Sequence, residues 1–244
     1  MDIQSKNQTI LVLSDPHQDV DRLERILLKE SYDTVVCLGD WWDSWHKNTD
    51  QYVIDTCKFL VEWLPKSNFF SVIGNHDVPY LFNNINTACG GCNRGQLVRA
   101  TFGDQLIKFR EMFKWYIWID NFLCTHAGVH PVHFSPQFKV TKKNVTTWLD
   151  KEIKSAEIVL PAGGSHWMCS AGQARCGRLP KGGITWLDFD EEFEPIKGLK
   201  QIVGHTAHKN VVSIGSNYDI DCFLNEWITI RNGKVTLRTL SDLD

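Results

Sequence analysis

Acidic, amide and imidazole side chains follow short apolar runs at several places in this sequence. The first run, "LVLS", leads into Asp15 and His17. The full set at such run ends is Asp15, His17, Asp40, Asn75, His126 and His205. Taken singly, an Asp can cap a helix, an Asn can hold a turn and a His can hydrogen-bond in a core. Their recurrence favours a shared role, and a metal ion would offset the cost of burying them.

The ligand types indicate which ions and which reaction to expect. Mixed oxygen and imidazole ligands suit manganese, iron or zinc, whereas an all-oxygen set would suit magnesium or calcium. Two such ions about 3.5–4 Å apart can hold a phosphoryl group and turn a water molecule between them into a hydroxide nucleophile near neutral pH. One carboxylate must then bridge both ions. The glycines before Asp40, Asn75 and His205 would permit the close backbone approach that such a centre needs.

The elements that must position these groups alternate between strand and helix. Strands are predicted at "TILVLS" (9–14), "TVVCL" (34–38) and "FFSVI" (69–73), and helices at "DVDRLERILLKE", capped by Asp19, and "YVIDTCKFLVEWL". This alternation predicts a parallel sheet covered on both faces, with ligands beyond the carboxyl ends of its strands. The later runs "NFLCT" and "QIVG" end in His126 and His205 in the same way.

The C-terminal third is predicted to be β structure. Its short runs are "NVVSIG", "YDIDCF", "EWITIR" and "KVTLRTL". The last two are joined by Asn-Gly, which is a strong hairpin signal. We expect these strands to complete a second sheet. Asp219 and Asp221 are interpreted as structural residues.

The motifs D-x-H, G-D-x-x-D, G-N-H-D, T-H-A-G and G-H-T follow one another between residues 15 and 206. This series resembles the calcineurin-like metallophosphoesterase family, in particular its branch of bacterial and phage protein Ser/Thr phosphatases and diadenosine tetraphosphatases. The resemblance implies an α/β fold in which two mixed β-sheets are sandwiched between helices. It also implies two divalent metal ions, with Mn²⁺ favoured and iron or zinc as alternatives.

The resemblance assigns a role to each motif residue. Asp15 and His17 would hold the first ion, Asp40 would bridge, and the second ion would be held by Asn75, His126 and His205. His76 would donate a proton to the leaving oxygen. Asp43 would orient His76 and keep it charged.

Two positions depart from the family pattern. Many members read G-H-x-H, but this chain has Ala207 at the second histidine, with His208 one residue out of phase. The related phosphatases follow G-D-x-x-D with an arginine that grips phosphate, where this chain has Ser44. The segment "QARCGRLPKGG" supplies other cations, and we expect Arg178 or Arg175 to bind the substrate phosphate instead.

Several features away from the motifs are interpreted as structural. Trp41 and Trp42 lie inside G-D-x-x-D, and packing is favoured over stacking on a base. His130 and His133 are expected to pack and hydrogen-bond. Residues 80–114 carry no motif and are predicted to be an insertion that shapes substrate access.

Composition narrows the class of protein. The 244 residues carry a formal charge of −3 and no linker or long apolar run, so we expect one domain, 1–244, that is intracellular and cytoplasmic. The near-neutral charge argues against a general binder of nucleic acids or anionic membranes. The eight cysteines favour a reduced protein with small apolar residues in its core. Cys89 and Cys92, with Cys169 and Cys176, could bind structural zinc, but we expect no such ion.

Three functional classes follow from these observations. The leading one is a two-metal phosphomonoesterase of the Ser/Thr protein phosphatase-like type, acting on a phosphoprotein or a similar phosphorylated group. The alternative is a hydrolase of nucleotides or dinucleoside polyphosphates, or a cyclic phosphodiesterase. A scaffold that lost the chemistry is least favoured, because every expected ligand is present.

Overall fold

Three neighbouring strands of the first sheet are parallel, as the strand–helix alternation predicted. The computed structural model describes residues 1–84 and 94–243. In it, β2 (Thr9–Leu13), β3 (Thr34–Cys37) and β4 (Phe69–Ser71) pair in parallel. The hairpin of β10 (Glu226–Arg231) and β11 (Lys234–Thr239) adds to β2 in antiparallel sense, giving the order β11-β10-β2-β3-β4.

The second sheet is also mixed. Its strands are β1 (Asp2–Ile3), β5 (Ile117–Ile119), β6 (Phe122–Cys124), β7 (Lys200–Val203), β8 (Val212–Ile214) and β9 (Asn217–Asp219). They lie in the order β1-β5-β6-β7-β9-β8, with β6–β7 parallel and β5–β6 antiparallel. The predicted α/β fold with two mixed sheets is therefore confirmed.

The C-terminal strands are divided between the two sheets, so part of their predicted placement is wrong. The Asn-Gly hairpin forms as predicted, and β8 and β9 join the second sheet, but β10 and β11 extend the first. Both faces of β10 carry buried residues. Ile228 and Ile230 pair with Val12 and Ile10 of β2 and join the core between the sheets. Trp227 faces the other way. The buried residues on both faces of β10 explain its interior position.

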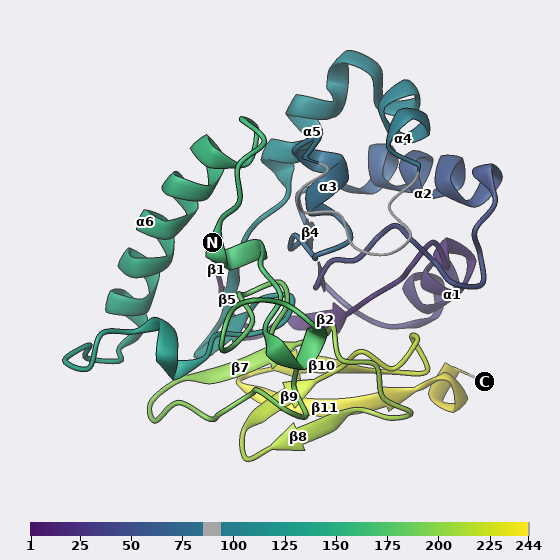
Figure 1. Ribbon diagram of the computed structural model, residues 1–244. Coiled ribbons are helices and arrows are strands. Elements are labelled where there is room, and N and C mark those ends of the chain that lie inside the picture. The colour runs from purple at the N-terminus through teal and green to yellow at the C-terminus, as the bar shows by residue number, and fades with distance from the viewer. Residues whose placement is uncertain (85–93, 244) are drawn as a thin grey trace.

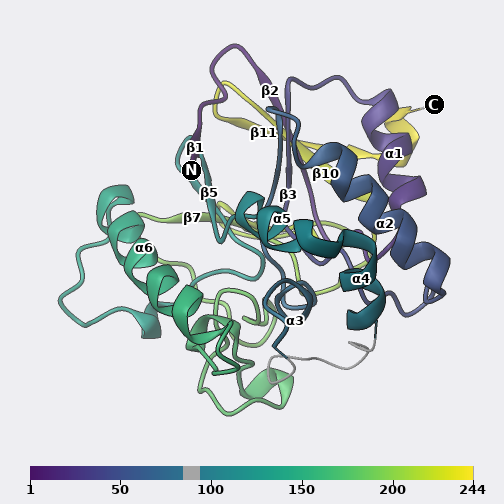
Figure 2. The ribbon, with the colours of Figure 1, turned by 90° about the horizontal axis from the view of Figure 1, so that it is seen from above.

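Helices cover the outer faces of the sheets. The helices α1 (Val20–Lys29) and α2 (Asp50–Trp63) lie on one side of the strands, and α6 (Lys142–Val159) lies on the opposite side in both views (Figure 1, Figure 2). The cap of α1 forms as predicted, because the Asp19 carboxylate accepts the N–H of Arg22 at 3.3 Å. The core between the sheets is aliphatic and includes Ile10, Val12, Val36, Leu38, Ile117, Ile119 and Ile202.

Residues 80–114 are largely helical where the structure describes them. The short α3 (Val78–Leu81) is followed by α4 (Gly95–Phe102) and α5 (Leu106–Met112), and α4 lies beside α2 (Figure 1, Figure 2). Phe102 and Phe109 are buried and their rings are 4.9 Å apart. The substrate-access role of residues 80–114 stays a prediction.

Short 3₁₀ turns occur at Gly103–Gln105, Pro131–His133, Trp167–Cys169, Gln173–Arg175 and Leu240–Leu243.

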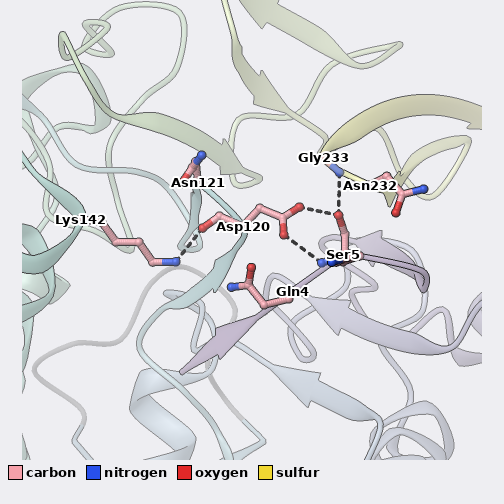
Figure 3. A pocket seen from close by; sticks show the side chains of 8 residues that line it. Gln4, Ser5, Asp120, Asn121, Lys142, Asn232 and Gly233 are labelled. Atoms are coloured by element: carbon pink, nitrogen blue, oxygen red, sulfur yellow. Dashed lines mark hydrogen bonds between the residues drawn. The ribbon is translucent and has the colours of Figure 1, made fainter.

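A polar pocket lies at the end of β2 that is remote from Asp15. Figure 3 shows Asp120 in this pocket, accepting the backbone N–H of Ser5 at 2.9 Å, while its carbonyl accepts from Lys142 at 2.6 Å. Gly233 donates to the Ser5 hydroxyl at 2.7 Å. These contacts join the chain before β2 to the β5–β6 and β10–β11 turns. We therefore interpret this pocket as structural.

The cysteines that the structure describes fit the core interpretation, with one exception. Cys37, Cys57, Cys124, Cys169 and Cys222 are buried and Cys176 is exposed, all as free thiols. Burial raises the pKa of Cys57 and Cys222 to about 12, so both are protonated near neutral pH. Cys89 and Cys92 lie outside the described residues, so the absence of a zinc site there stays a prediction.

None of the helices in ranges 1–84 and 94–243 is long and apolar enough to cross a lipid bilayer.

Candidate metal centre

The predicted ligands meet beyond the carboxyl ends of β2, β3, β4, β6 and β7. They form two groups that share one carboxylate: Asp15, His17 and Asp40 in the first, and Asp40, His126 and His205 in the second. Within each group the ligand atoms all lie within 4.8 Å of one another. Asn75 belongs to the second group, because its Oδ1 lies 2.8 Å from His126 Nε2 and 2.9 Å from His205 Nδ1.

Glycines let the loops at this edge approach closely, as the sequence predicted. A Cβ on Gly74 would lie 2.0 Å from Asp40 Oδ1, and a Cβ on Gly204 would lie 2.1 Å from Asp15 Oδ2. Asp15, Asp40 and His205 have left-handed backbones, with φ of +52°, +59° and +76°. Tight left-handed turns therefore direct the ligand side chains toward one another.

Backbone carbonyls fix the orientation of two histidines. His17 Nδ1 lies 2.9 Å from the carbonyl of Trp42, and His126 Nδ1 lies 2.8 Å from that of Leu38. A carbonyl only accepts, so each Nδ1 carries the hydrogen and directs Nε2 toward the centre. The two Nε2 atoms lie 3.7 Å and 3.4 Å from Asp40 Oδ2. Such a partner on the remote nitrogen is the usual support of a metal-binding histidine.

Asp77, the last residue of G-N-H-D, holds two loops together. Its buried carboxylate accepts the backbone N–H groups of Asp40, Trp41 and Gly74 at 2.9, 2.8 and 2.8 Å. It therefore links the loop after β3 to the loop after β4. No role was predicted for Asp77 from the sequence, although its place in the motif was a usable signal.

The centre concentrates buried negative charge. Burial and the neighbouring Asp221 hold the pKa of Asp15 well above its usual value. Burial also raises the pKa of Asp221 to about 6. Burial would raise the pKa of Asp40 as well, but His126 and His76 outweigh it and hold that pKa well below its usual value.

The histidines respond in opposite ways. Burial opposes a charged His126, but Asp40 and Asp15 outweigh burial and raise the pKa of His126 to about 9. Burial, His126 and Arg175 hold the pKa of His205 well below its usual value. A neutral His205 can bind a cation, whereas His126 must first lose a proton.

The donor set and the unsatisfied atoms fit two divalent cations. Among the described residues, Asp15 Oδ1 is buried without a hydrogen-bond partner. Asn75 Oδ1 faces other lone pairs, and turning the amide over would relieve that contact without an ion. A turned amide does not relieve Asp15 Oδ1 in the first group. A cation in the first group would satisfy Asp15 Oδ1, a cation in the second group would meet Asn75 Oδ1, His126 Nε2 and His205 Nδ1, and both would offset the buried carboxylate charge.

His76 and Asp43 form a pair beside the first group. The His76 ring nitrogen Nδ1 lies 3.0 Å from Asp43 Oδ2, and the backbone N–H of His76 donates to Asp40 Oδ1 at 2.9 Å. The rings of His76 and His17 are 5.2 Å apart. The buried Tyr80 hydroxyl donates to Asp43 Oδ1, so Asp43 is held from both sides. No role was predicted for Tyr80 from the sequence, because no motif contains it.

Of the two predicted phosphate-binding arginines, Arg175 lies nearer the centre. Its Nε is 2.7 Å from Asp188 Oδ2, and its guanidinium donates to Thr206 Oγ1 at 3.3 Å, next to His205. Arg178 is exposed and lines a pocket of about 570 Å³ together with Arg175 and Trp186. The Trp186 ring is 5.4 Å from that of His205. This pocket, which we call the arginine pocket, therefore borders the second ligand group.

Glu192 organises the loop that carries Arg175. Its buried carboxylate accepts the N–H groups of Ala174 and Gly182 at 3.1 and 2.7 Å. A Cβ on Gly172 would lie 2.2 Å from Glu192 Oε1, so the loop folds tightly around this side chain. Glu192 and Asp188 were both missed, because buried acids in a loop carry no periodic signal.

The remaining candidates take structural places, as the sequence favoured. Trp41 and Trp42 are fully buried; Trp41 stacks on Phe59, so the packing interpretation is confirmed. His130 accepts from Val132 N at 3.0 Å, and His133 Nε2 lies 2.9 Å from a backbone carbonyl. Asp219 is buried and accepts the N–H of Asp221 at 2.9 Å.

Two loop histidines, which the sequence could not place, differ in position. His46 is exposed and lines a pocket that also includes Asp15 and His17. His166 lies 3.8 Å from Glu152 of α6 and belongs to neither ligand group. His208 lies 3.8 Å from Asp219 and likewise belongs to neither group.

Comparison with known proteins agrees with the motif series. The family described as calcineurin-like phosphoesterase matches residues 8–209. No curated protein matches the chain in sequence.

Solved structures share the fold at low sequence identity. A cold-active protein-tyrosine phosphatase of a psychrophilic Shewanella species has a TM-score of 0.61 at 15% identity, covering 98% of this chain and 82% of that one. A protein serine/threonine phosphatase from Saccharomyces cerevisiae has a TM-score of 0.55 at 13% identity, covering 97% and 82%. At such identities the likeness concerns the fold.

Proposed function

Since the chain belongs to the calcineurin-like phosphoesterase family and is a metal-dependent phosphoester hydrolase, we propose that it is a phosphomonoesterase with a two-ion centre. The observation that carries this proposal is the pair of ligand groups sharing Asp40, with the His76–Asp43 pair beside them. When bound, two divalent ions would supply a nucleophile from water and neutralise charge on the phosphoryl oxygens. The imidazole-rich second group supports manganese as the preferred ion over magnesium.

The proposed proton donor is His76. A departing alkoxide needs a proton, and an imidazolium beside the first ligand group can give one. Asp43 accepts from His76 Nδ1 at 3.0 Å, which would stabilise the charged ring and fix its plane. Tyr80 in turn donates to Asp43. Because Tyr80 begins the segment 80–114, we also propose that this segment shapes access to the centre. Residues 1–244 are proposed to form a single domain.

Arg175 and Arg178 are proposed to bind the substrate phosphate in place of the arginine that Ser44 replaces. A guanidinium can pair with two phosphoryl oxygens at once. The place of Arg175 next to His205 supports this role, and the ion pair with Asp188 holds its guanidinium there. Arg178 lies exposed on the arginine pocket and would meet a substrate approaching from solvent.

One observation favours a second candidate, a hydrolase of nucleotides or dinucleoside polyphosphates or a cyclic phosphodiesterase. The guanidinium groups of Arg175 and Arg178 in the arginine pocket together offer more N–H donors than the oxygens of one phosphate group need when metal ions are also bound. A second phosphate group would use the remaining donors. The phosphomonoesterase remains the first proposal.

The free thiols of the described cysteines support a reducing, cytoplasmic setting.

A substrate panel tests the proposal. The Mn²⁺-loaded protein would be assayed on a phosphoserine peptide, a phosphotyrosine peptide, a cyclic nucleotide, a bis(aryl) phosphate and a dinucleoside polyphosphate. We expect the highest kcat/KM on a phosphomonoester, and loss of that activity in Asp40→Asn. A higher kcat/KM on the diester, the cyclic nucleotide or the polyphosphate would replace the first proposal with the second.

A further inference from the structure

A second pocket borders the metal centre at the first ligand group. It has a volume of about 420 Å³, and Asp15 and His17 of the first ligand group form part of its wall. Phe223 and Leu224 also line it. We call it the Phe223 pocket. The arginine pocket, by contrast, borders His205 of the second group through Trp186.

The aromatic wall of this pocket is held in a strained turn. Phe223 and Leu224 have φ of +58° and +55°, which is rare for bulky side chains. The Arg22 guanidinium donates to the Phe223 carbonyl at 2.6 Å and to Asn225 Oδ1 at 3.2 Å, and both contacts hold the turn. The Phe223 side chain is left 54% exposed. A strained backbone that presents an apolar ring beside the metal ligands points to a binding role.

The charges of the Phe223 pocket are compensated within the protein. Lys47 Nζ lies 2.7 Å from Asp19 Oδ1, and Arg22 Nε lies 3.5 Å from Asp19 Oδ2. The Ser44 hydroxyl accepts the N–H of Lys47 at 2.9 Å. In the arginine pocket, Arg178 forms no ion pair with any residue in the described ranges. A neutral, apolar group therefore suits the Phe223 pocket, and anionic oxygens suit the arginine pocket.

The position of the proton donor links the Phe223 pocket to the leaving group. His17 lines this pocket, and its ring is 5.2 Å from the ring of His76. The ester oxygen that His76 protonates is bonded to the leaving group, so that group must lie beside His17. A ring bonded directly to the ester oxygen would lie in the Phe223 pocket with no linker between the two. A nucleobase is separated from its phosphate by a polar sugar, and the two cations of the pocket, Arg22 and Lys47, are already paired with Asp19.

We propose that the Phe223 pocket is the leaving-group subsite and that it takes the ring of an aryl phosphate, the phosphotyrosyl side chain being the form that proteins carry. This inference rests on the proposed phosphomonoesterase function and names its substrate class. The oxygen of water bonds to phosphorus as water gives one proton to solvent, the bond from phosphorus to the aryl oxygen breaks, and the phenol leaves with the proton from His76, which regains a proton from solvent. No further reactant is needed.

Two peptides of one sequence, carrying phosphotyrosine or phosphoserine, test the subsite. We expect the wild-type protein, loaded with Mn²⁺, to have the higher kcat/KM on the phosphotyrosine peptide. Phe223→Ala should lower the ratio of the two kcat/KM values by about tenfold, because it removes one aromatic contact. Leu237→Ala is the matched control, since Leu237 is 49% exposed on β11, and this change should leave the ratio as it is. A ratio of two substrates is insensitive to a partly folded sample.

The outcomes separate this inference from the proposed function. An active wild type with equal kcat/KM on both peptides, or a ratio unchanged by Phe223→Ala, would overturn the subsite alone. A preference for AMP over the phosphotyrosine peptide that is lost in Phe223→Ala would overturn it in favour of a nucleobase. Absence of Mn²⁺-dependent activity on every phosphomonoester would instead overturn the proposed function.

Discussion

At the scale of single residues, Asp40 occupies the most demanding position in the centre. It is the one carboxylate common to both ligand groups that the described residues form. It also accepts the N–H of His76, and its own N–H is held by Asp77. Removing its charge would leave two cations that repel one another without their shared anion.

We therefore expect Asp40→Asn to cost more activity than His17→Ala. Loss of ion-mediated charge stabilisation, worth several kcal/mol, should lower kcat/KM by about a thousandfold. Steady-state kinetics with elemental analysis of each variant measure this. Full activity of Asp40→Asn at unchanged metal content would contradict the two-ion centre.

Removal of His76 should affect activity and metal content differently from removal of a metal ligand. His76→Ala should retain metal and lose about ten- to a thousandfold more activity on an alkyl phosphate than on a nitrophenyl phosphate, whose leaving group needs no proton. Asp43→Asn should show the same pattern more weakly. The comparison variant is Asn75→Ala, which should lower both activities together with metal occupancy. Equal losses on both substrates in His76→Ala, accompanied by loss of metal, would place His76 among the ligands.

The raised pKa of His126 couples metal binding to pH. In the protein without ions, Asp40 and Asp15 raise this pKa to about 9, so the charged ring stabilises the fold fully below its unfolded pKa of about 6.5. That stabilisation is lost as the pH rises through about 9. Binding of an ion needs the neutral ring, so at pH 7.5 it should release about one proton from His126. Calorimetry of Mn²⁺ binding in buffers of different ionisation enthalpy measures the release, and a heat independent of the buffer would contradict it.

At the scale of elements, strand ends and loops contributed unequally to what the sequence could predict. The convergence of Asp15 and His205 on one centre was predictable because each follows an apolar run and belongs to a local motif. The sheet that β10 joins was not, because its apolar residues Trp227, Ile228 and Ile230 fit a strand of either sheet. Tyr80 and Glu192 act through contacts with residues distant in the chain, which local spacing does not reveal. Local patterns thus predicted which side chains meet at the centre, and long-range packing determined which residues support them.

The loop around Glu192 also contains Asp188, whose contact near the centre is its ion pair with Arg175. Substitution of Asp188 therefore tests whether this loop positions Arg175. Asp188→Asn keeps an acceptor for the turn but removes the ion pair, and should lower kcat/KM about tenfold. In an Arg175→Ala background it should have no further effect. Asp190→Asn, an exposed acid of the same turn, is the control and should be neutral. Additive losses in the double variant would show that Asp188 acts on something other than Arg175.

At the scale of the whole molecule, the second ligand group joins the two sheets. Asp40 and Asn75 follow strands of the first sheet, whereas His126 and His205 follow strands of the second. An ion held by all four would therefore tie the sheets together at their carboxyl edges. Ion binding should accordingly stabilise the whole fold.

We expect chelation to abolish turnover and to lower Tm, and Mn²⁺ to restore both better than Mg²⁺ does. At one hundred times its Kd an ion adds about 2.7 kcal/mol, or roughly 5–10 °C in a protein of this size. Thermal unfolding with and without each ion measures this, and Asp40→Asn should show a much smaller shift. Full activity with Mg²⁺ alone would contradict the preference.

The left-handed turns at Asp15, Asp40 and His205 bear on how this sequence can change over generations. A side chain on such a backbone costs about 1 kcal/mol, and two of these residues are buried acids as well. Glycine at Asp15 would relax the turn and remove a buried carboxylate whose pKa is raised, giving a more stable protein without a complete first ligand group. Selection for stability alone would thus remove this acid first. The centre endures only in lineages where turnover itself is selected.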